Sequence, residues 1–61
     1  MMHQDAPRFF IVGYDSENDI AQQQCYFIDS ATTLERARAK RFDSENRYPI
    51  VRIKDLNGQF V

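Results

Sequence analysis

Only one segment of this chain has the pattern of an amphipathic helix, and short runs of β-branched and aromatic residues lie on both sides of it. Three such runs have the length and composition of strands. They are RFFIVGY at 8–14, a stretch from roughly Gln23 to Asp29, and IVRIK at 50–54. Because two strands precede the helix and one follows it, the sequence predicts a β-β-α-β order and the α+β class.

Both faces of the first run are apolar, which is typical of a central strand. We expect the first and second strands to form an antiparallel hairpin, with the polar segment DSENDIAQ between them as a turn. A right-handed crossover through the helix then returns the third strand beside the first, in parallel. Asn57-Gly58 predicts a second hairpin, because both residues accept the positive φ of such turns, and QFV forms a short fourth strand. The expected fold is a small antiparallel or mixed sheet with one helix packed on one face.

The helix is predicted within the segment DSATTLERARAKRF. Thr32 and Glu35 fit a capping box, in which each side chain bonds the main-chain N–H of the other residue. Other candidate caps are Asp29, Ser30 and Thr33. The residues expected to face the sheet are Ala31, Leu34, Ala37 and Phe42. Pro49 forbids continuation of the helix, so the segment DSENRYP ends it.

A chain of 61 residues is one domain at most, and we expect a tail at 1–7 followed by a single domain at 8–61. Its core must be thin, because domains near this size bury only about 60% of the surface that their unfolded chains expose. The expected core residues are Phe9 or Phe10, Ile11, Val12, Tyr26, Phe27, Ile28, Leu34, Val51, Ile53 and Leu56. Domains this small often rely on a disulfide, a metal or a second subunit. We therefore expect self-association, or a partner that completes the core.

Cys25 is the only cysteine, which excludes an internal disulfide. It lies in the apolar stretch CYFI, so a buried structural cysteine is the preferred interpretation and a reactive thiol is the alternative. The stretch MMHQDAPR lacks the basic region and the long apolar segment of a signal peptide. The longest apolar run, at 9–12, is too short to cross a bilayer. These features predict a cytoplasmic protein that does not contact a membrane.

The sequence contains no set of residues typical of an enzyme. The only histidine, His3, lies in the expected tail, and the only glycines, Gly13 and Gly58, form no phosphate-binding loop. There is no CxxC motif and no HExxH motif. We therefore expect no catalytic activity, no cofactor and no bound metal.

The word DSEN occurs twice, at 15–18 and at 43–46. Acidic residues alternate around the first copy as at the start of a calcium loop, but the loop glycine and the distal glutamate are missing. The second copy is followed by Arg47, whose charge repels a cation. Asp, Ser and Asn favour turns, so we interpret both copies as solvated turns rather than as ligand sites or a duplicated unit.

Charge is unevenly distributed along the chain, although the net charge is only −1. Residues 1–35 carry six acidic side chains and one basic side chain, whereas 36–61 carry seven basic and three acidic ones. On a helical projection Arg36 and Lys40 share the outer face, while Arg38 and Arg41 lie near the sheet-facing stripe. This cluster is either a solvated helix face or a patch that binds a partner. The candidate partner-binding residues are Arg36, Arg38, Lys40, Arg41, Arg47, Arg52 and Lys54.

Two segments carry a resemblance to known proteins, TLERA at 33–37 and PIVRIKDLNG at 49–58. Together with the β-β-α-β layout, they are similar to small β-β-α-β(-β) proteins found in phages and mobile elements, some of which are anti-CRISPR inhibitors. The resemblance covers about residues 9–61. It implies a protein that acts by occupying the surface of a partner, without catalysis.

Three functions are compatible with the sequence. The first is a small non-enzymatic protein-binding module, an inhibitor or regulator of a larger protein or complex, whose basic helix or acidic hairpin end meets an oppositely charged partner. The second is a nucleic-acid-binding module that uses the same basic residues, although the slightly negative net charge weighs against it. The third is a subunit, for example of a homodimer, whose role is assembly through an exposed edge strand.

Overall fold

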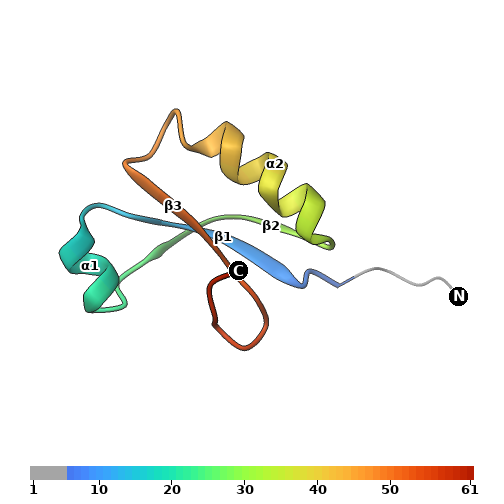
Figure 1. Cartoon of the computed structure of the whole chain (residues 1–61), viewed down its shortest axis with the longest axis horizontal. Coiled ribbons are helices and arrows are strands. Elements are labelled where there is room, and N and C mark those ends of the chain that lie inside the picture. The colour runs from blue at the N-terminus through green and yellow to red at the C-terminus, as the bar shows by residue number, and fades with distance from the viewer. Residues whose placement is uncertain (1–5) are drawn as a thin grey trace, which may run out of the picture.

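The computed structural model describes residues 6–61, so all but two residues of the expected tail at 1–7 lie outside it. The elements are, in order, β1 (Phe9–Tyr14), α1 (Glu17–Ala21), β2 (Tyr26–Ala31), α2 (Leu34–Ser44) and β3 (Ile50–Lys54). The three strands form a sheet and α2 packs on it, as Figure 1 shows. The prediction of a small α+β fold with a helix packed on one face of the sheet is confirmed.

β1 is the central strand, as predicted, and the sheet has the order β2-β1-β3. Both pairs are antiparallel, with Gly13 of β1 opposite Tyr26 on β2 and opposite Val51 on β3. The expectation that β3 lies parallel to β1 is therefore wrong. α2 runs back along the sheet, antiparallel to β2 (Figure 1). β3 therefore runs in the same direction as β2, which is opposite to the direction of β1. The crossover through α2 joins the two outer strands, and β1 lies between them.

The segment after β1 forms the short helix α1, where the sequence predicts only a turn. Ser16 is its N-cap: the residue is extended, and its Oγ accepts a hydrogen bond from the N–H of Asp19 at 3.3 Å. A serine three residues before an acidic residue is the sequence signal for such a cap. Gln23 has φ +59°, in the left-handed region, and turns the chain toward β2. The first DSEN segment thus begins a helix, whereas the second forms the end of α2 and the residues after it.

β2 begins later than expected and contains a β-bulge. Ile11 pairs with Asp29, while the next residue of β1, Val12, pairs with Phe27. Ile28 is therefore the extra residue of the bulge. It interrupts the alternation of side chains along the strand, which is why a pattern with a period of two does not describe β2.

α2 begins after Thr33, one of the candidate caps. Its Oγ1 accepts a hydrogen bond from the main-chain N–H three residues later, at 3.2 Å, so the predicted cap at Thr32 is wrong. Ala37 is buried against the sheet and Leu34 packs beside it, as expected. Phe42 is 74% exposed, and its assignment to the sheet-facing stripe is wrong. It follows Ala37 by five residues, which turns it about 140° away around the helix.

The main core lies between α2 and the sheet. Its buried members are Ile11, Ala31, Ala37, Val51 and Ile53, and Phe9, Ile28, Leu34 and Tyr48 pack against them. Two expected core residues, Phe27 and Leu56, are instead 66% and 67% exposed. The bulge turns Phe27 away from α2, and Leu56 lies in the turn after β3. Cys25 lies directly before β2 and is an exposed free thiol, so the prediction of a buried cysteine is also wrong.

A candidate protein interface on the open face of the sheet

One face of the sheet is covered by α2 (Figure 1). The other face carries its own set of side chains. Ile11 belongs to the core under α2, so its neighbours in β1 face away from α2, because side chains alternate along a strand. Residues paired directly across neighbouring strands share a face. The face away from α2, called the open face below, therefore consists of Phe10, Val12, Tyr14, Phe27, Ser30, Ile50, Arg52 and Lys54.

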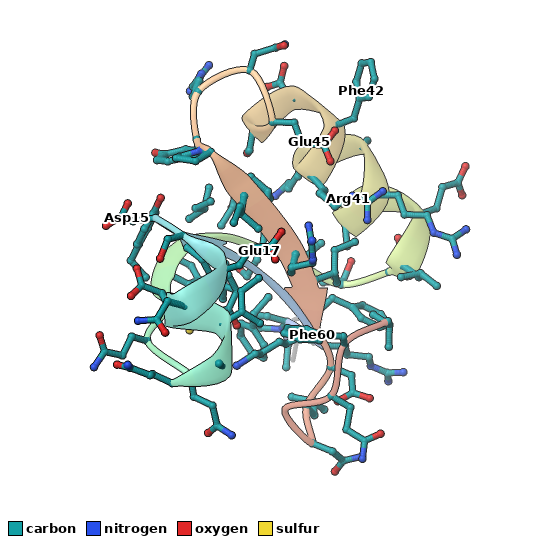
Figure 2. All side chains as sticks on the ribbon, turned by 60° about the vertical axis from the view of Figure 1, so that its left-hand side comes forward. Asp15, Glu17, Arg41, Phe42, Glu45 and Phe60 are labelled. Carbon is teal, nitrogen blue, oxygen red and sulfur yellow. The ribbon has the colours of Figure 1, made fainter. Side chains whose placement is uncertain are left out.

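Two residues of the open face, Val12 and Tyr14, are buried although α2 lies on the other side of the sheet. Tyr14 is only 1% exposed. α1 contacts β1, and the ring of Phe60 meets the ring of Tyr14 edge-on, with 6.3 Å between the centroids. In both views α1 and the C-terminal loop lie on the side of the sheet away from α2 (Figures 1 and 2). They form a small second core around Tyr14.

The C-terminal segment is held beside β3 by its main chain. The N–H of Val61 donates to the carbonyl oxygen of Ile53 at 3.0 Å, and Phe60 forms an isolated β-bridge with Lys54. Gly58 has φ +81°, whereas Asn57 is not among the described residues with positive φ, so only one of the two residues adopts the conformation predicted for the hairpin turn. The predicted fourth strand is thus reduced to one bridge, which fixes the position of the Phe60 ring.

The open face exposes aromatic rings beside basic side chains. Phe27 is mostly exposed, and Phe60 is 50% exposed. Arg52 is exposed, and its Nη1 donates to the main-chain oxygen of Val51 at 2.9 Å, which holds the guanidinium close to the sheet. The Nζ of Lys54 lies 5.6 Å from the centroid of the Phe60 ring, in a cation–π contact. Aromatic residues and arginine are the residue types that are enriched in protein interfaces.

An acidic border lies at one end of the open face. It is formed by Glu17 and Asp19, in the first turn of α1, and no basic residue occurs between positions 9 and 35. Figure 2 shows Asp15 and Glu17 at α1, apart from Arg41 and its neighbours on α2. The open face therefore combines an acidic end at α1 with basic side chains on β3.

The same acidic segment acts on Tyr26, on the α2 side of the sheet. The pKa of the Tyr26 phenol is raised above its ordinary value of 10.0, first because burial disfavours the phenolate and then because of the negative charge of Asp15. The Tyr26 ring lies over Gly13, its partner on β1, and packs against Tyr48 with 5.7 Å between the ring centroids. These contacts make Tyr26 part of the packing of the sheet and disfavour its ionised form.

The structure does not bring the seven predicted basic residues together. Arg36 and Arg38 are exposed on α2, and Arg47 is exposed in the loop that follows it. Arg52 and Lys54 lie on the open face, on the opposite side of the sheet. Basic side chains therefore occur on two separate surfaces.

Lys40 and Arg41 are engaged within the chain. The Nζ of Lys40 donates to the carbonyl oxygen of Ser30 at 2.7 Å and lies 3.4 Å from Oδ1 of Asp29, so its predicted position on the outer face of α2 is wrong. The same Asp29 oxygen accepts a hydrogen bond from the Ser30 N–H at 2.8 Å. The Nε of Arg41 is 3.6 Å from Oε2 of Glu45, an ion-pair distance that is too long for a hydrogen bond (Figure 2). Both side chains tie parts of this chain together rather than reaching outward.

Among residues 6–61, no group of three His, Cys, Asp or Glu side chains could hold a metal ion. His3 lies outside the described residues. Neither helix in the described part of the chain is long and apolar enough to cross a membrane.

Comparison with protein-family models, with curated proteins and with solved structures found no match to this chain. The resemblance to small proteins of phages and mobile elements therefore stays a prediction. Any function has to be argued from the surface that the fold presents.

Sequence reasoning assigned Phe27 to the core and gave Phe60 no role, so it missed the open face. A usable signal was present, because both faces of β1 are apolar and a single helix of 11 residues can cover only one of them. A second apolar face needs a second cover. α1 and Phe60 supply that cover around Tyr14, while Phe27 stays exposed.

Proposed function

We propose that this chain is a small non-enzymatic protein-binding module and that the open face is its binding surface. The observation that carries the proposal is the exposure of two aromatic rings, Phe27 and Phe60, on a face that also presents Arg52. Burial of one such side chain contributes about 1.5–3 kcal/mol. A few aromatic and arginine residues dominate the binding energy of most protein interfaces, so this face has the residues that a tight contact needs.

A role as an inhibitor or regulator of a larger protein fits this mode of binding, because it requires only that the open face cover a surface of the partner. The ionisable side chains of the face also favour binding over catalysis. On its strands they are Tyr14, Arg52 and Lys54, and none of these is hydrogen-bonded to a carboxylate or an imidazole among the residues described. A general base or an activated nucleophile would need such a partner.

Photo-crosslinking tests the proposal. Phe27 is replaced by a photoreactive phenylalanine analogue in the full chain, and cells that produce it are irradiated. Phe42 is the matched control, because it is also an exposed phenylalanine but lies on α2. We expect a protein adduct from position 27 and little or none from position 42. Equal labelling at both positions, or no protein adduct from position 27, would show that the open face is not the binding surface.

Single-stranded nucleic acid is the second candidate partner, because aromatic rings beside basic side chains on a sheet can also stack bases. The acidic border weighs against it, since Glu17 and Asp19 would repel phosphates at the end of the same face. Fluorescence anisotropy with short DNA and RNA oligonucleotides at low salt separates the two candidates. We expect no binding, whereas binding that weakens steeply with added salt would favour a nucleic-acid partner.

A further inference from the structure

We propose that the open face binds a second copy of this chain, in a two-fold symmetric dimer in which α1 of each protomer contacts β3 of the other. This inference rests on the proposed function, because it names the partner of the same surface. Three observations support it: the arrangement of charge on the open face, the exposed rings of Phe27 and Phe60, and the contacts at the edges of the sheet.

The charged groups of the open face are separated from each other within one chain. The acidic border at α1 adjoins Tyr14, at the end of β1, whereas Arg52 pairs with Val12 and Lys54 pairs with Phe10, both closer to the beginning of β1. Within residues 6–61 the ion pairs are Lys40–Asp29 and Arg41–Glu45, so none joins α1 to β3. Both signs of charge are therefore available on this face for an outside partner.

A surface with separated acidic and basic regions is complementary to a rotated copy of itself. In a two-fold dimer the same patch is used by both protomers, so each contact occurs twice. When the acidic border of one protomer meets Arg52 and Lys54 of the other, both charge contacts are attractive at once. A polyanion would satisfy only the basic side chains, and the acidic border would repel it.

The apolar residues of the open face point to the same occupant. Phe27 is exposed on β2, and half of the Phe60 ring is exposed beside β3. Small domains often gain the stability that their own core lacks from a second subunit. A face-to-face dimer removes both rings of both protomers from water in one interface, with no residue outside this chain required.

Edge-to-edge pairing, the other common route to a dimer of sheets, is hindered at Ser30 on β2 and at the end of β3. On β2, the N–H of Ser30 is bonded to Asp29 and its carbonyl oxygen is bonded to Lys40. Neither group is free to pair with another strand. Next to β3, the bridge between Lys54 and Phe60 occupies the end of the strand. These edges direct association to the face of the sheet.

Two charge-reversal variants of the full chain test the dimer, Glu17→Lys and Arg52→Glu. Both positions are exposed, so folding should be preserved, which circular dichroism checks. By sedimentation over a wide range of concentration, we expect the wild type to dimerise and each variant to dimerise on the order of tenfold more weakly. An equimolar mixture should recover the wild-type affinity as a heterodimer. In the mixture the new lysine faces the new glutamate, and the native Glu17 faces the native Arg52, so both contacts are attractive again.

A matched pair on α2, Glu35→Lys and Arg36→Glu, controls for net charge. Glu35 is in the first turn of α2 as Glu17 is in the first turn of α1, and both control residues are exposed on the other side of the sheet. We expect these variants to dimerise like the wild type, alone and when mixed. Equal weakening in both pairs would show that net charge, and not the contact of α1 with β3, controls association.

The outcomes separate this inference from the proposed function. The wild type could remain a monomer at every concentration while position 27 crosslinks to a different protein. In that case the proposal that the partner is a second copy of this chain is wrong, and the proposed protein-binding function stands. If the wild type is a dimer but the mixture of Glu17→Lys and Arg52→Glu does not recover the wild-type affinity, the proposed contact between α1 of one protomer and β3 of the other is wrong. Absence of both a dimer and a protein adduct would overturn the two proposals together.

Discussion

The ring of Tyr26 lies so close to Gly13 that a Cβ atom on Gly13 would be 2.5 Å from Cε1 of the ring. The two residues are direct partners on β2 and β1. A glycine in the middle of a central strand normally weakens it, because it has no side chain to pack. Here the aromatic ring fills the space above the glycine and covers the main chain, an arrangement known to stabilise glycine in sheets.

Replacement of Gly13 by alanine should therefore destabilise the fold by about 1–3 kcal/mol, the usual cost of overpacking. Urea denaturation monitored by circular dichroism measures the change in the free energy of unfolding. The double variant Gly13→Ala/Tyr26→Leu is the control, because the smaller side chain relieves the contact. The cost of the alanine should fall in that background. An equal cost in both backgrounds would mean that the ring does not restrict position 13.

Removal of the N-cap hydroxyl in Thr33→Ala should cost about 1 kcal/mol, because the main-chain N–H of Arg36 loses its acceptor. Thr32→Ala is the matched control at the neighbouring threonine, which the capping-box pattern selects but which does not cap α2. Its effect should be less than half as large. Thermal unfolding of both variants checks the order, and a larger loss in Thr32→Ala would place the cap one residue earlier.

Lys40→Met keeps most of the length of the side chain but removes the charge and the hydrogen bond to Ser30. We expect a loss of about 1 kcal/mol, since the pair with Asp29 is partly exposed and the hydrogen bond to the main chain contributes most of the effect. We also expect a greater tendency to aggregate, because the edge of β2 is uncovered. Arg36→Met on the same helix is the control and should change neither stability nor light scattering.

The stability of the fold should decrease above about pH 10 as Tyr26 ionises. Its pKa is raised in the folded state, so the folded chain holds the phenolic proton more tightly than the unfolded chain does. The resulting stabilisation is fully present below the unfolded pKa and is lost as the pH rises through the folded pKa. Tyr26→Phe should remove this part of the pH dependence, and Asp15→Asn should lower the pKa of the phenol. Ultraviolet titration of tyrosinate and unfolding at several pH values measure both effects.

The amino-acid sequence was sufficient to predict those helices and strands whose residue pattern is regular. β1, β3 and α2 follow from apolar runs and helical spacing, and Pro49 marks the end of the connection between α2 and β3. The direction of β3 also follows from the order of elements, once α2 is required to run back along the sheet. The predicted parallel pairing with β1 overlooked that β2 had already reversed the chain.

Other features depend on contacts that a pattern does not contain. α1 has five residues and depends on one cap at Ser16, and DSEN is equally suited to a turn. The bulge at Ile28 shifts the faces of β2, so Phe27 could not be assigned to the correct side from its spacing. Lys40 was assigned to the outer face by helical projection, but its long side chain reaches back to the strand that precedes α2.

The bulge at Ile28 has a consequence for how this chain can vary. In an unbroken strand Phe27 and Asp29, two residues apart, would lie on the same side of the sheet. The extra residue shifts the phase, so that Phe27 lies on the open face while Asp29 lies on the α2 side with Lys40. Substitutions at position 27 can therefore change the surface of the open face without disturbing the group that closes the edge of the sheet. One short strand therefore places a side chain on each face of the sheet at positions 27 and 29, and only the second of them takes part in closing the sheet edge.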